Sequence, residues 1–261
     1  MTTPSHIAVD DSTPIVRVML DEPARRNPLS LATMRELITT LETIDTTHAR
    51  VVVLGGNGPA FSAGHDLGEI AGIEHDGDYT ELFDTCVALM RTIHRIAQPV
   101  IARVHGVATA AGCQLVAGCD LAVCTDTARF ATPGVNIGLF CSTPMVPLTR
   151  AVGRKRSMAM LLTGEMIDAA TAREWGLVNE VVPEDALDDA VGRLAGRIVQ
   201  ASGEVVALGK RTFWEQLEVG ESEAYALTAP VMARNATLAD AREGIDAFLH
   251  KRTPDWPSAQ V

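Results

Sequence analysis

Short apolar runs alternate with amphipathic stretches over about the first 200 residues of the chain. Apolar residues recur at helical spacing from Leu31 to Ile44, with Ser30 as the expected N-cap. A second helical stripe runs from Leu82 to Ile96 and ends before Pro99. The predicted strands are the short apolar runs Ile15–Leu20, Val51–Leu54, Val100–Val104, Leu121–Thr125 and Leu177–Val182. Strands that alternate with helices in this way predict βαβ-type units and an α/β fold.

The pattern changes after Pro183, where helical periodicity continues almost without interruption to residue 250. We place a boundary near Ser202, which separates an α/β domain over residues 1–201 from a helical region over residues 202–261. The helical region is too thin to bury its own apolar face, so we expect it to pack on its own domain or on another subunit. The polar segment Gly72–Tyr79 is expected to be a mobile loop.

The composition provides for a large core and argues against several kinds of partner. A chain of 261 residues with 47% hydrophobic residues can form one large core, or a main domain with a small appendage. The formal charge of −11 argues against a surface for nucleic acid or an anionic membrane. No apolar run approaches the ~18 residues that span a bilayer. The segment Met1–Pro14 resembles neither a signal peptide nor a transit peptide, so we expect a cytoplasmic location.

The cysteines and histidines give no sign of a metal site. The five cysteines are odd in number, form no Cys-x-x-Cys pair and lie in apolar stretches. We interpret them as buried, reduced thiols rather than as a disulfide or a metal cluster. The seven histidines are scattered without ligand spacing, so we expect no metal site.

Two segments rich in small residues stand out from a generic α/β pattern. They are Pro59–Glu69 and His105–Leu115, and each opens what the pattern predicts to be a helix after a strand. Small residues let a ligand approach the backbone, and helix N-termini present free N–H groups. Two such donors aimed at one point would form an oxyanion hole. The alternative is that each segment is only a tight packing turn between a strand and a helix.

These two segments, in this order, resemble the crotonase (enoyl-CoA hydratase/isomerase) family. The resemblance extends from about Ile15 to Pro254, and the chain is similar in particular to the enoyl-CoA hydratase domain-containing subgroup of the family. Its further motifs are Arg129–Leu139, Leu148–Gly153, Leu161–Asp168, Glu174–Pro183 and Glu243–Arg252. The resemblance implies a spiral of ββα turns over residues 1–201 and a helical trimerisation region over residues 202–261. It also implies trimers or pairs of trimers.

The ligand that the resemblance implies is an acyl-coenzyme A thioester, with no tightly bound cofactor. Its carbonyl oxygen would be held by the backbone N–H groups of His65 and Ala111. In most members of the family the second donor is a glycine, but an alanine N–H can still donate. The His65 ring is either a hydrogen-bond donor or base in the pocket, or it has no role and only the backbone N–H of this residue matters. The adenine pocket would use the backbone around Ala63, Asp66 and Leu67, and the phosphates would contact Arg25 or Arg26 together with Phe248, Lys251 and Arg252.

The chain departs from the family at both carboxylates that a hydratase of this family uses. Gln114 stands at the first position and Gly134 at the second. An amide does not exchange protons near neutral pH, and glycine has no side chain. The polar groups that remain near the expected reaction centre are those of Thr132, Cys141, Ser142 and Thr143, with the His65 ring.

Three functions therefore stay open from the sequence. The first is an enzyme of fatty-acyl-CoA metabolism, nominally a hydratase, whose chemistry is supported by the oxyanion hole and a water network. The second is a decarboxylase or thioesterase that uses the same hole, since decarboxylation needs little acid–base help. The third is an acyl-CoA binding protein without catalysis. A Ser-His peptidase of the Clp type is disfavoured because no Gly-x-Ser-x-Gly motif occurs.

Overall fold

A six-stranded sheet, sheet A, lies at the centre of the computed structural model, which describes residues 5–12 and 14–259. Its strands in spatial order are β1 (Ile7–Asp10), β2 (Ile15–Leu20), β4 (Val51–Gly56), β7 (Val100–Val104), β9 (Leu121–Thr125) and β12 (Glu180–Val182). Strand β1 is antiparallel to β2, and every other neighbouring pair is parallel. Parallel neighbours need crossover connections, which the helices of the chain provide.

Two smaller sheets complete the β-structure. Sheet C has the order β11 (Ile167–Asp168), β10 (Arg129–Ala131), β8 (Val107–Thr109) and β5 (Ala60–Ser62), and sheet B pairs β3 (Pro28–Leu29) with β6 (Gly64–His65). The strand pairs β4–β5, β7–β8 and β9–β10 each place one strand in sheet A and the next in sheet C before the chain turns into a helix. The fold is therefore a spiral of ββα units, as the family resemblance implies.

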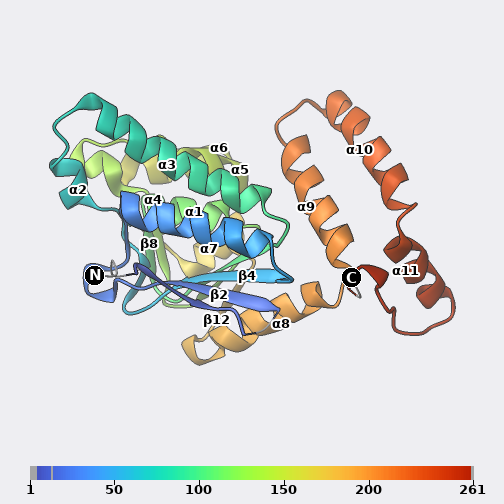
Figure 1. The fold of residues 1–261 in the computed structure, drawn as a ribbon. Coiled ribbons are helices and arrows are strands. Elements are labelled where there is room, and N and C mark those ends of the chain that lie inside the picture. The colour runs from blue at the N-terminus through green and yellow to red at the C-terminus, as the bar shows by residue number, and fades with distance from the viewer. Residues whose placement is uncertain (1–4, 13, 260–261) are drawn as a thin grey trace.

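Helices cover both faces of sheet A (Figure 1). The helices of the spiral are α1 (Leu31–Asp45), α2 (Leu67–Ala71), α3 (Asp76–Arg95), α4 (Ala111–Gly118), α5 (Met145–Val152), α6 (Arg154–Thr163), α7 (Ala169–Trp175) and α8 (Leu187–Val199). Short 3₁₀ turns lie at Pro23–Arg25, Pro133–Ile137, Glu184–Ala186 and Pro257–Ala259. The apolar stripes of α1 and α3 pack on one face, whereas α8 packs on Val51, Val53 and Ile101 of the other. Helix α4 is buried along nearly its whole length, which explains why it is apolar on all sides.

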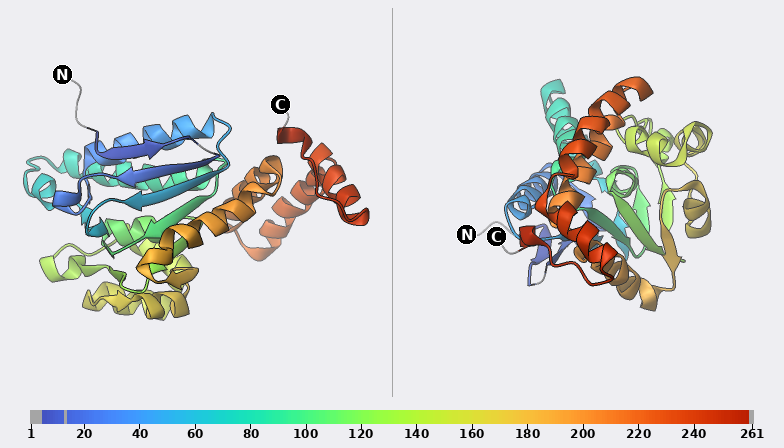
Figure 2. Two further views of the ribbon diagram at one scale, coloured as in Figure 1. Left: turned by 90° about the horizontal axis from the view of Figure 1, so that it is seen from below. Right: turned by 90° about the vertical axis from the view of Figure 1, so that its right-hand side faces the viewer.

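Three C-terminal helices extend away from the spiral (Figure 2). They are α9 (Gly203–Gln216), α10 (Glu221–Asn235) and α11 (Ala239–Leu249). Ser202 is the N-cap of α9, so the boundary placed from the sequence lies at the junction of α8 and α9. Among the described residues, no helix has both the length and the apolar character needed to cross a bilayer.

The structure corrects three details of the predicted elements. Segment Gly72–Tyr79 is only partly a loop, since α3 already begins at Asp76 with acidic residues in its first turn. The strand predicted over Leu177–Val182 is restricted to Glu180–Val182, because Leu177 and Val178 are buried in the turn after α7. Strand β1 was not expected; it adds an antiparallel edge to sheet A within a polar N-terminal segment. The described cysteines are all buried and unpaired, as predicted.

Candidate functional site

The candidate residues gather where the strands of sheet C end. Strands β5, β8 and β10 are parallel, and parallel strands place their carboxyl ends at one edge of a sheet. Two hydrogen bonds join the segments beyond these ends: the Thr109 hydroxyl donates to the Ala63 carbonyl at 3.1 Å, and the Ala110 N–H donates to the Ala131 carbonyl at 2.9 Å. The segments that contain His65, Ala111 and Thr132, which are far apart in the sequence, are thereby neighbours in space.

Two glycines bring the first two of these segments into close contact. Gly64 has φ +92°, and a Cβ atom there would lie 2.9 Å from the Ala110 Cβ and 3.1 Å from the Ala111 nitrogen. A Cβ atom at Gly112 would lie 2.4 Å from the Ser62 carbonyl oxygen. Neither position can therefore hold a side chain. The two glycines hold the backbone of the turn before α2 directly against the N-terminus of α4.

Ala111 offers its backbone N–H at this contact. It is the first residue of α4, where the N–H groups have no partner within the helix, and it is fully buried. Ala110 before it has φ 50° and ψ −118°, an unfavourable conformation for a residue with a Cβ atom. Strain of this kind costs about 1–3 kcal/mol and is concentrated at functional sites. The strained residue lies at the entry to the helix that carries the expected oxyanion donor.

The His65 ring has a fixed orientation beside this turn. Its Nδ1 lies 3.1 Å from the Leu29 carbonyl oxygen, and its ring meets the edge of Phe83 at a centroid distance of 5.6 Å. A carbonyl oxygen only accepts hydrogen bonds, so Nδ1 carries the proton in the neutral ring. Burial lowers the pKa of His65, which favours this neutral form. Neither Leu29 nor Phe83 was expected from the sequence, because a distant carbonyl and an ordinary core aromatic carry no motif.

Gln114 is buried on the inner side of α4. Its side-chain oxygen accepts a hydrogen bond from the Cys86 thiol at a sulfur–oxygen distance of 3.5 Å. It also lines a cavity of about 900 Å³ between α3, α4, α5 and α9. Helix α9 is fixed beside this cavity by Lys210, whose ammonium group donates to the Asp120 carboxylate at 2.8 Å. The Trp214 Nε1–H donates to the same carboxylate at 2.8 Å.

At Gly134, where the resemblance places the second hydratase carboxylate, the space for a side chain is filled by the protein itself. A Cβ atom at Gly134 would lie 2.0 Å from the Leu139 carbonyl oxygen and 2.9 Å from the Cys141 Sγ. The Leu139 N–H in turn donates to the Gly134 carbonyl at 2.9 Å. No side chain can begin at this point unless the segment from Leu139 to Cys141 moves. The glycine is thus part of a closed turn and not merely a missing glutamate.

The other predicted polar residues differ in how they are placed. Thr132 is fully buried, and its hydroxyl has no hydrogen-bond partner among the described residues. Cys141 is buried, and this burial raises the pKa of its thiol, so the thiol stays protonated near neutral pH. Ser142 is exposed, and its hydroxyl donates to the nearby Phe140 carbonyl at 3.4 Å. Thr143 lines the cavity of Gln114.

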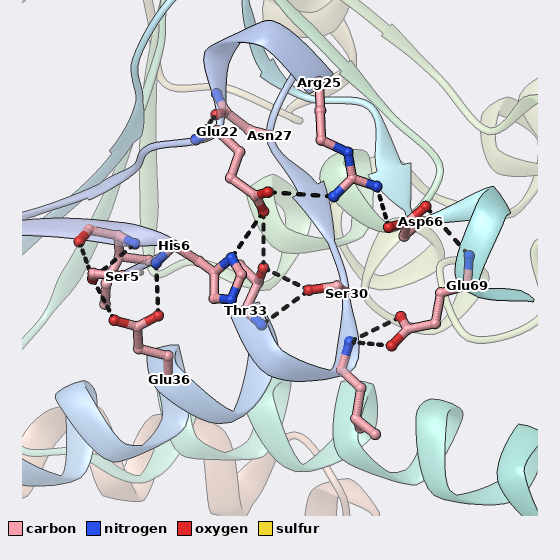
Figure 3. A network of polar contacts seen from close by, with 12 residues as sticks. Ser5, His6, Glu22, Arg25, Asn27, Ser30, Thr33, Glu36, Asp66 and Glu69 are labelled. Atoms are coloured by element: carbon pink, nitrogen blue, oxygen red, sulfur yellow. Dashed lines mark hydrogen bonds and ion pairs between the residues drawn. The ribbon is translucent and has the colours of Figure 1, made fainter. Parts of the chain in front are cut away.

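Of the two predicted phosphate-binding cations near the site, Arg25 is engaged by carboxylates. Figure 3 shows the Arg25 guanidinium between the carboxylates of Glu22 and Asp66. Asp66 also caps α2 by accepting from the N–H groups of Gly68 and Glu69. Leu67, at the start of α2, is exposed. Arg26 is exposed, and its carbonyl accepts from the Ala63 N–H at 2.9 Å.

The predicted C-terminal contacts lie at the opposite end of the molecule from these groups (Figures 1 and 2). Phe248 is 82% exposed, and Lys251 is exposed. The Arg252 guanidinium forms ion pairs with Glu243 and Asp246. One chain alone does not bring these three residues to Arg25. Their role in phosphate binding stays a prediction that requires a second subunit.

The fold and this edge of sheet C place the chain among known proteins. A family model described as Enoyl-CoA hydratase/isomerase matches residues 10–259, and the chain belongs to this family. Within it, the chain is 48% identical to rat enoyl-CoA hydratase domain-containing protein 3, mitochondrial, over 243 residues, which are 93% of the chain and 81% of the relative. It is 34% identical to Escherichia coli 2,3-dehydroadipyl-CoA hydratase over 254 residues, covering 97% and 98% of the two chains.

Solved structures agree with this assignment. An enoyl-CoA hydratase of Mycobacterium smegmatis superimposes with a TM-score of 0.94 at 46% identity, covering 96% of the chain and 98% of that structure. Human enoyl-CoA hydratase domain-containing protein 3 gives a TM-score of 0.93 at 45% identity, covering 96% and 100%. The predicted crotonase fold, with its C-terminal helical region, is confirmed.

The expected cytoplasmic location is contradicted by the relatives. The rat, frog, mouse and human proteins similar to this chain all carry the word mitochondrial in their names. The physical reason for the error is that compartments are addressed by short processing segments, which the charge and core of a folded domain do not report.

Proposed function

We propose that this chain binds an acyl-CoA thioester and stabilises the negative charge that develops on its carbonyl oxygen. The observation that carries the proposal is the contact of Gly64 with Ala111, which holds the backbone after Gly64 against the N-terminus of α4. Two backbone N–H groups, from His65 and Ala111, would then converge on one oxygen. A donor of this kind typically contributes ~10²–10³ in rate. The names of relatives such as enoyl-CoA hydratase domain-containing protein 3 and 2,3-dehydroadipyl-CoA hydratase support a thioester of the enoyl type.

The same site argues against efficient hydration of a 2-enoyl thioester. Hydration needs one group to activate water and another to manage the α-proton, and each positioned group contributes ~10²–10⁴. The Gln114 side-chain amide already accepts a hydrogen bond from the Cys86 thiol, and the Leu139 carbonyl occupies the space that a side chain at Gly134 would need. We therefore expect crotonyl-CoA hydration far below the typical enzyme rate of ~10 s⁻¹.

A second candidate function is decarboxylation of an acyl-CoA whose acyl group bears a carboxylate. In that reaction carbon dioxide leaves with its bond electrons remaining on the thioester, so the enolate forms without a base. The closed turn at Gly134 favours this reading, because the site keeps the expected oxyanion donors and removes a carboxylate that would repel such a substrate. An assay of methylmalonyl-CoA turnover that measures the carbon dioxide released separates this candidate from simple binding.

The proposed thioester site is tested by removing one backbone donor. Ala111 is the first residue of α4, the helical position at which proline is best tolerated. Ala111→Pro removes the N–H, whereas Ala111→Gly keeps it and serves as the matched control. Butyryl-CoA at 100 times its Kd should stabilise the wild type by about 2.7 kcal/mol in thermal unfolding. We expect Ala111→Gly to keep most of this stabilisation and Ala111→Pro to lose it. Equal responses of the two variants would refute the assignment of Ala111.

A further inference from the structure

Five buried side-chain atoms in the described part of the chain lack a hydrogen-bond partner. They are His65 Nε2, Gln98 Oε1, His105 Nδ1, Thr132 Oγ1 and Asn235 Oδ1. Leaving such an atom unpaired is costly, so each calls for an explanation. Two of the five, on His65 and Thr132, lie in the segments that follow the carboxyl ends of β5 and β10, and His65 also carries one of the proposed backbone donors. Their clustering there points to a ligand that completes their hydrogen bonds.

The state of His65 Nε2 follows from the bond on the other side of the ring. Nδ1 donates to the Leu29 carbonyl, so in the neutral ring Nε2 carries a bare lone pair. The edge contact with Phe83 and the Leu29 bond together fix the ring, which leaves Nε2 in one place. Nε2 is thus a hydrogen-bond acceptor of fixed orientation that has no donor among the described residues.

The surroundings keep this ring neutral at the start of a reaction. Burial lowers the pKa of His65, and the carboxylate of Glu69 on α2 is the charged group that acts on the ring in the opposite direction. Glu69 is itself occupied by the N–H of Leu31, at 3.0 and 3.3 Å. It would stabilise an imidazolium that forms, without holding the ring protonated beforehand.

The other candidate side chains do not offer a comparable base. Gln114 is an amide, and Gly134 has no side chain. The Cys141 thiol has a raised pKa because it is buried. The Thr132 hydroxyl is a weak base that can donate or accept. Among these candidates, His65 alone combines a free lone pair, a fixed orientation and a place next to the proposed oxyanion donors.

We propose that His65 Nε2 is the proton acceptor of this site and that it removes the α-proton of a bound acyl-CoA thioester. The inference rests on the proposed thioester function. In the step, the lone pair of Nε2 takes the proton, and the electrons of the Cα–H bond form a Cα–C double bond. The carbonyl π electrons move onto the oxygen, where the N–H groups of His65 and Ala111 bind the enolate. Return of a proton from the imidazolium restores the thioester, so no co-reactant is needed.

Exchange of the α-protons of butyryl-CoA in D₂O, followed by mass spectrometry, tests this step without any net reaction. The wild type should catalyse exchange above the rate in buffer. His65→Asn is the key variant, because its amide nitrogen can replace Nδ1 as the donor to the Leu29 carbonyl while nothing replaces Nε2. His65→Ala removes both functions of the ring, and both variants retain the backbone N–H. We expect exchange to fall ~10²-fold or more in both, with the Kd for butyryl-CoA within about threefold of the wild type.

The outcomes separate this inference from the function on which it rests. Exchange by His65→Asn at the wild-type rate would show that the ring is only structural and would overturn the proposal. A wild type that binds butyryl-CoA without exchanging its protons would overturn it as well. A wild type that binds no thioester would instead refute the proposed function. Nitrogen NMR of the histidine ring provides a reading that does not depend on activity: we expect an unprotonated Nε2 at pH 7 whose resonance shifts when butyryl-CoA binds.

Discussion

The Leu139 carbonyl lies where a side chain at position 134 would begin, and this single contact changes how the missing carboxylate is understood. The family resemblance implies only that glycine stands in place of a glutamate. The structure shows that the Leu139 carbonyl oxygen occupies this space, 2.0 Å from the place of a Cβ atom. Restoring the carboxylate therefore requires a different backbone and not only a different side chain.

The closed turn predicts a stability effect that is specific to this glycine. Gly134→Ala should lower the free energy of unfolding by about 1–3 kcal/mol, because overpacking forces the backbone apart. Gly192 in α8 is the matched control, since a Cβ atom there meets nothing within 4 Å. Gly192→Ala should be neutral or stabilising by up to about 1 kcal/mol, as expected for alanine in a helix. Denaturant unfolding of both variants measures the difference, and equal effects would show that the turn yields easily.

Gln114 gives the second prediction at this scale, since its side chain, unlike that of Gly134, has room in the structure. Gln114→Glu should raise crotonyl-CoA hydration, with a gain below ~10² because burial beside Cys86 raises the pKa of the new carboxyl group. Its base form increases with pH, so the gain should grow from pH 5 to pH 8. Gln114→Met, of similar volume, should give no gain.

Adding Gly134→Glu to Gln114→Glu should not increase this rate further, because the new side chain collides with the Leu139 carbonyl. The double variant should also unfold more easily than the single one. A faster double variant of unchanged stability would show that the segment from Leu139 to Cys141 rearranges without penalty.

Among the elements, α8 shows how a helix is fixed to sheet A by more than its apolar face. Its Asp188 carboxylate accepts two hydrogen bonds from Arg103 on β7, both at 2.9 Å, and one from Arg17 on β2, also at 2.9 Å. The Arg103 hydrogen bonds hold the pKa of Asp188 well below its usual range, with Arg17 contributing in the same direction. The helix is thereby tied to two parallel strands at once.

This depressed pKa predicts a pH-dependent contribution to stability. A carboxyl group whose pKa is lower in the folded state stabilises it above the unfolded-state pKa of about 3.9, and the effect is lost as pH falls from that value through the lower pKa of the folded state. Because Asp188 is half exposed, solvent screening limits the effect to about 1 kcal/mol at pH 7. Asp188→Asn should be less stable than the wild type at pH 7, and the difference should shrink as pH falls below about 4.

Asp189→Asn, one residue further along α8 and exposed, is the control for this effect and should change stability less at pH 7. Chemical unfolding at a series of pH values measures all three proteins. A difference between Asp188→Asn and the wild type that does not depend on pH would contradict the assignment of the ion pair.

At the scale of the whole molecule, the C-terminal helices carry an apolar surface that one chain does not cover. Tyr225, Met232, Phe248 and Leu249 are between 65% and 82% exposed, and α10 buries no residue. Exposed apolar patches of this kind mark interaction sites. The surface is consistent with the trimer or hexamer that the family resemblance implies, and the oligomeric state stays a prediction.

We expect sedimentation at micromolar concentration to show a trimer or hexamer. The double change Tyr225→Asp with Phe248→Asp should shift the protein to smaller species, since charges within a buried interface are costly. Val9→Asp, an exposed apolar residue of β1, is the control and should leave the assembly unchanged. A wild-type monomer would refute the assembly and, with it, the predicted contribution of Lys251 and Arg252 to a neighbouring site.

The sequence by itself determined the family and the spiral fold, and it predicted the absence of both hydratase carboxylates, because these are expressed in local motifs around Gly64, Ala111, Gln114 and Gly134. Hydrophobic periodicity also located α1, most of α3 and five of the six strands of sheet A, since each buries one face or is buried entirely, whereas the short strands of sheets B and C carry no such pattern. Only the tertiary structure decided that the Leu139 carbonyl fills the second carboxylate position, and that the Leu29 carbonyl leaves His65 Nε2 as a bare acceptor. The physical reason is that the filled space at Gly134 and the tautomer of His65 both depend on backbone carbonyl groups of other segments. Every residue type has the same carbonyl, so no sequence pattern announces where it will lie.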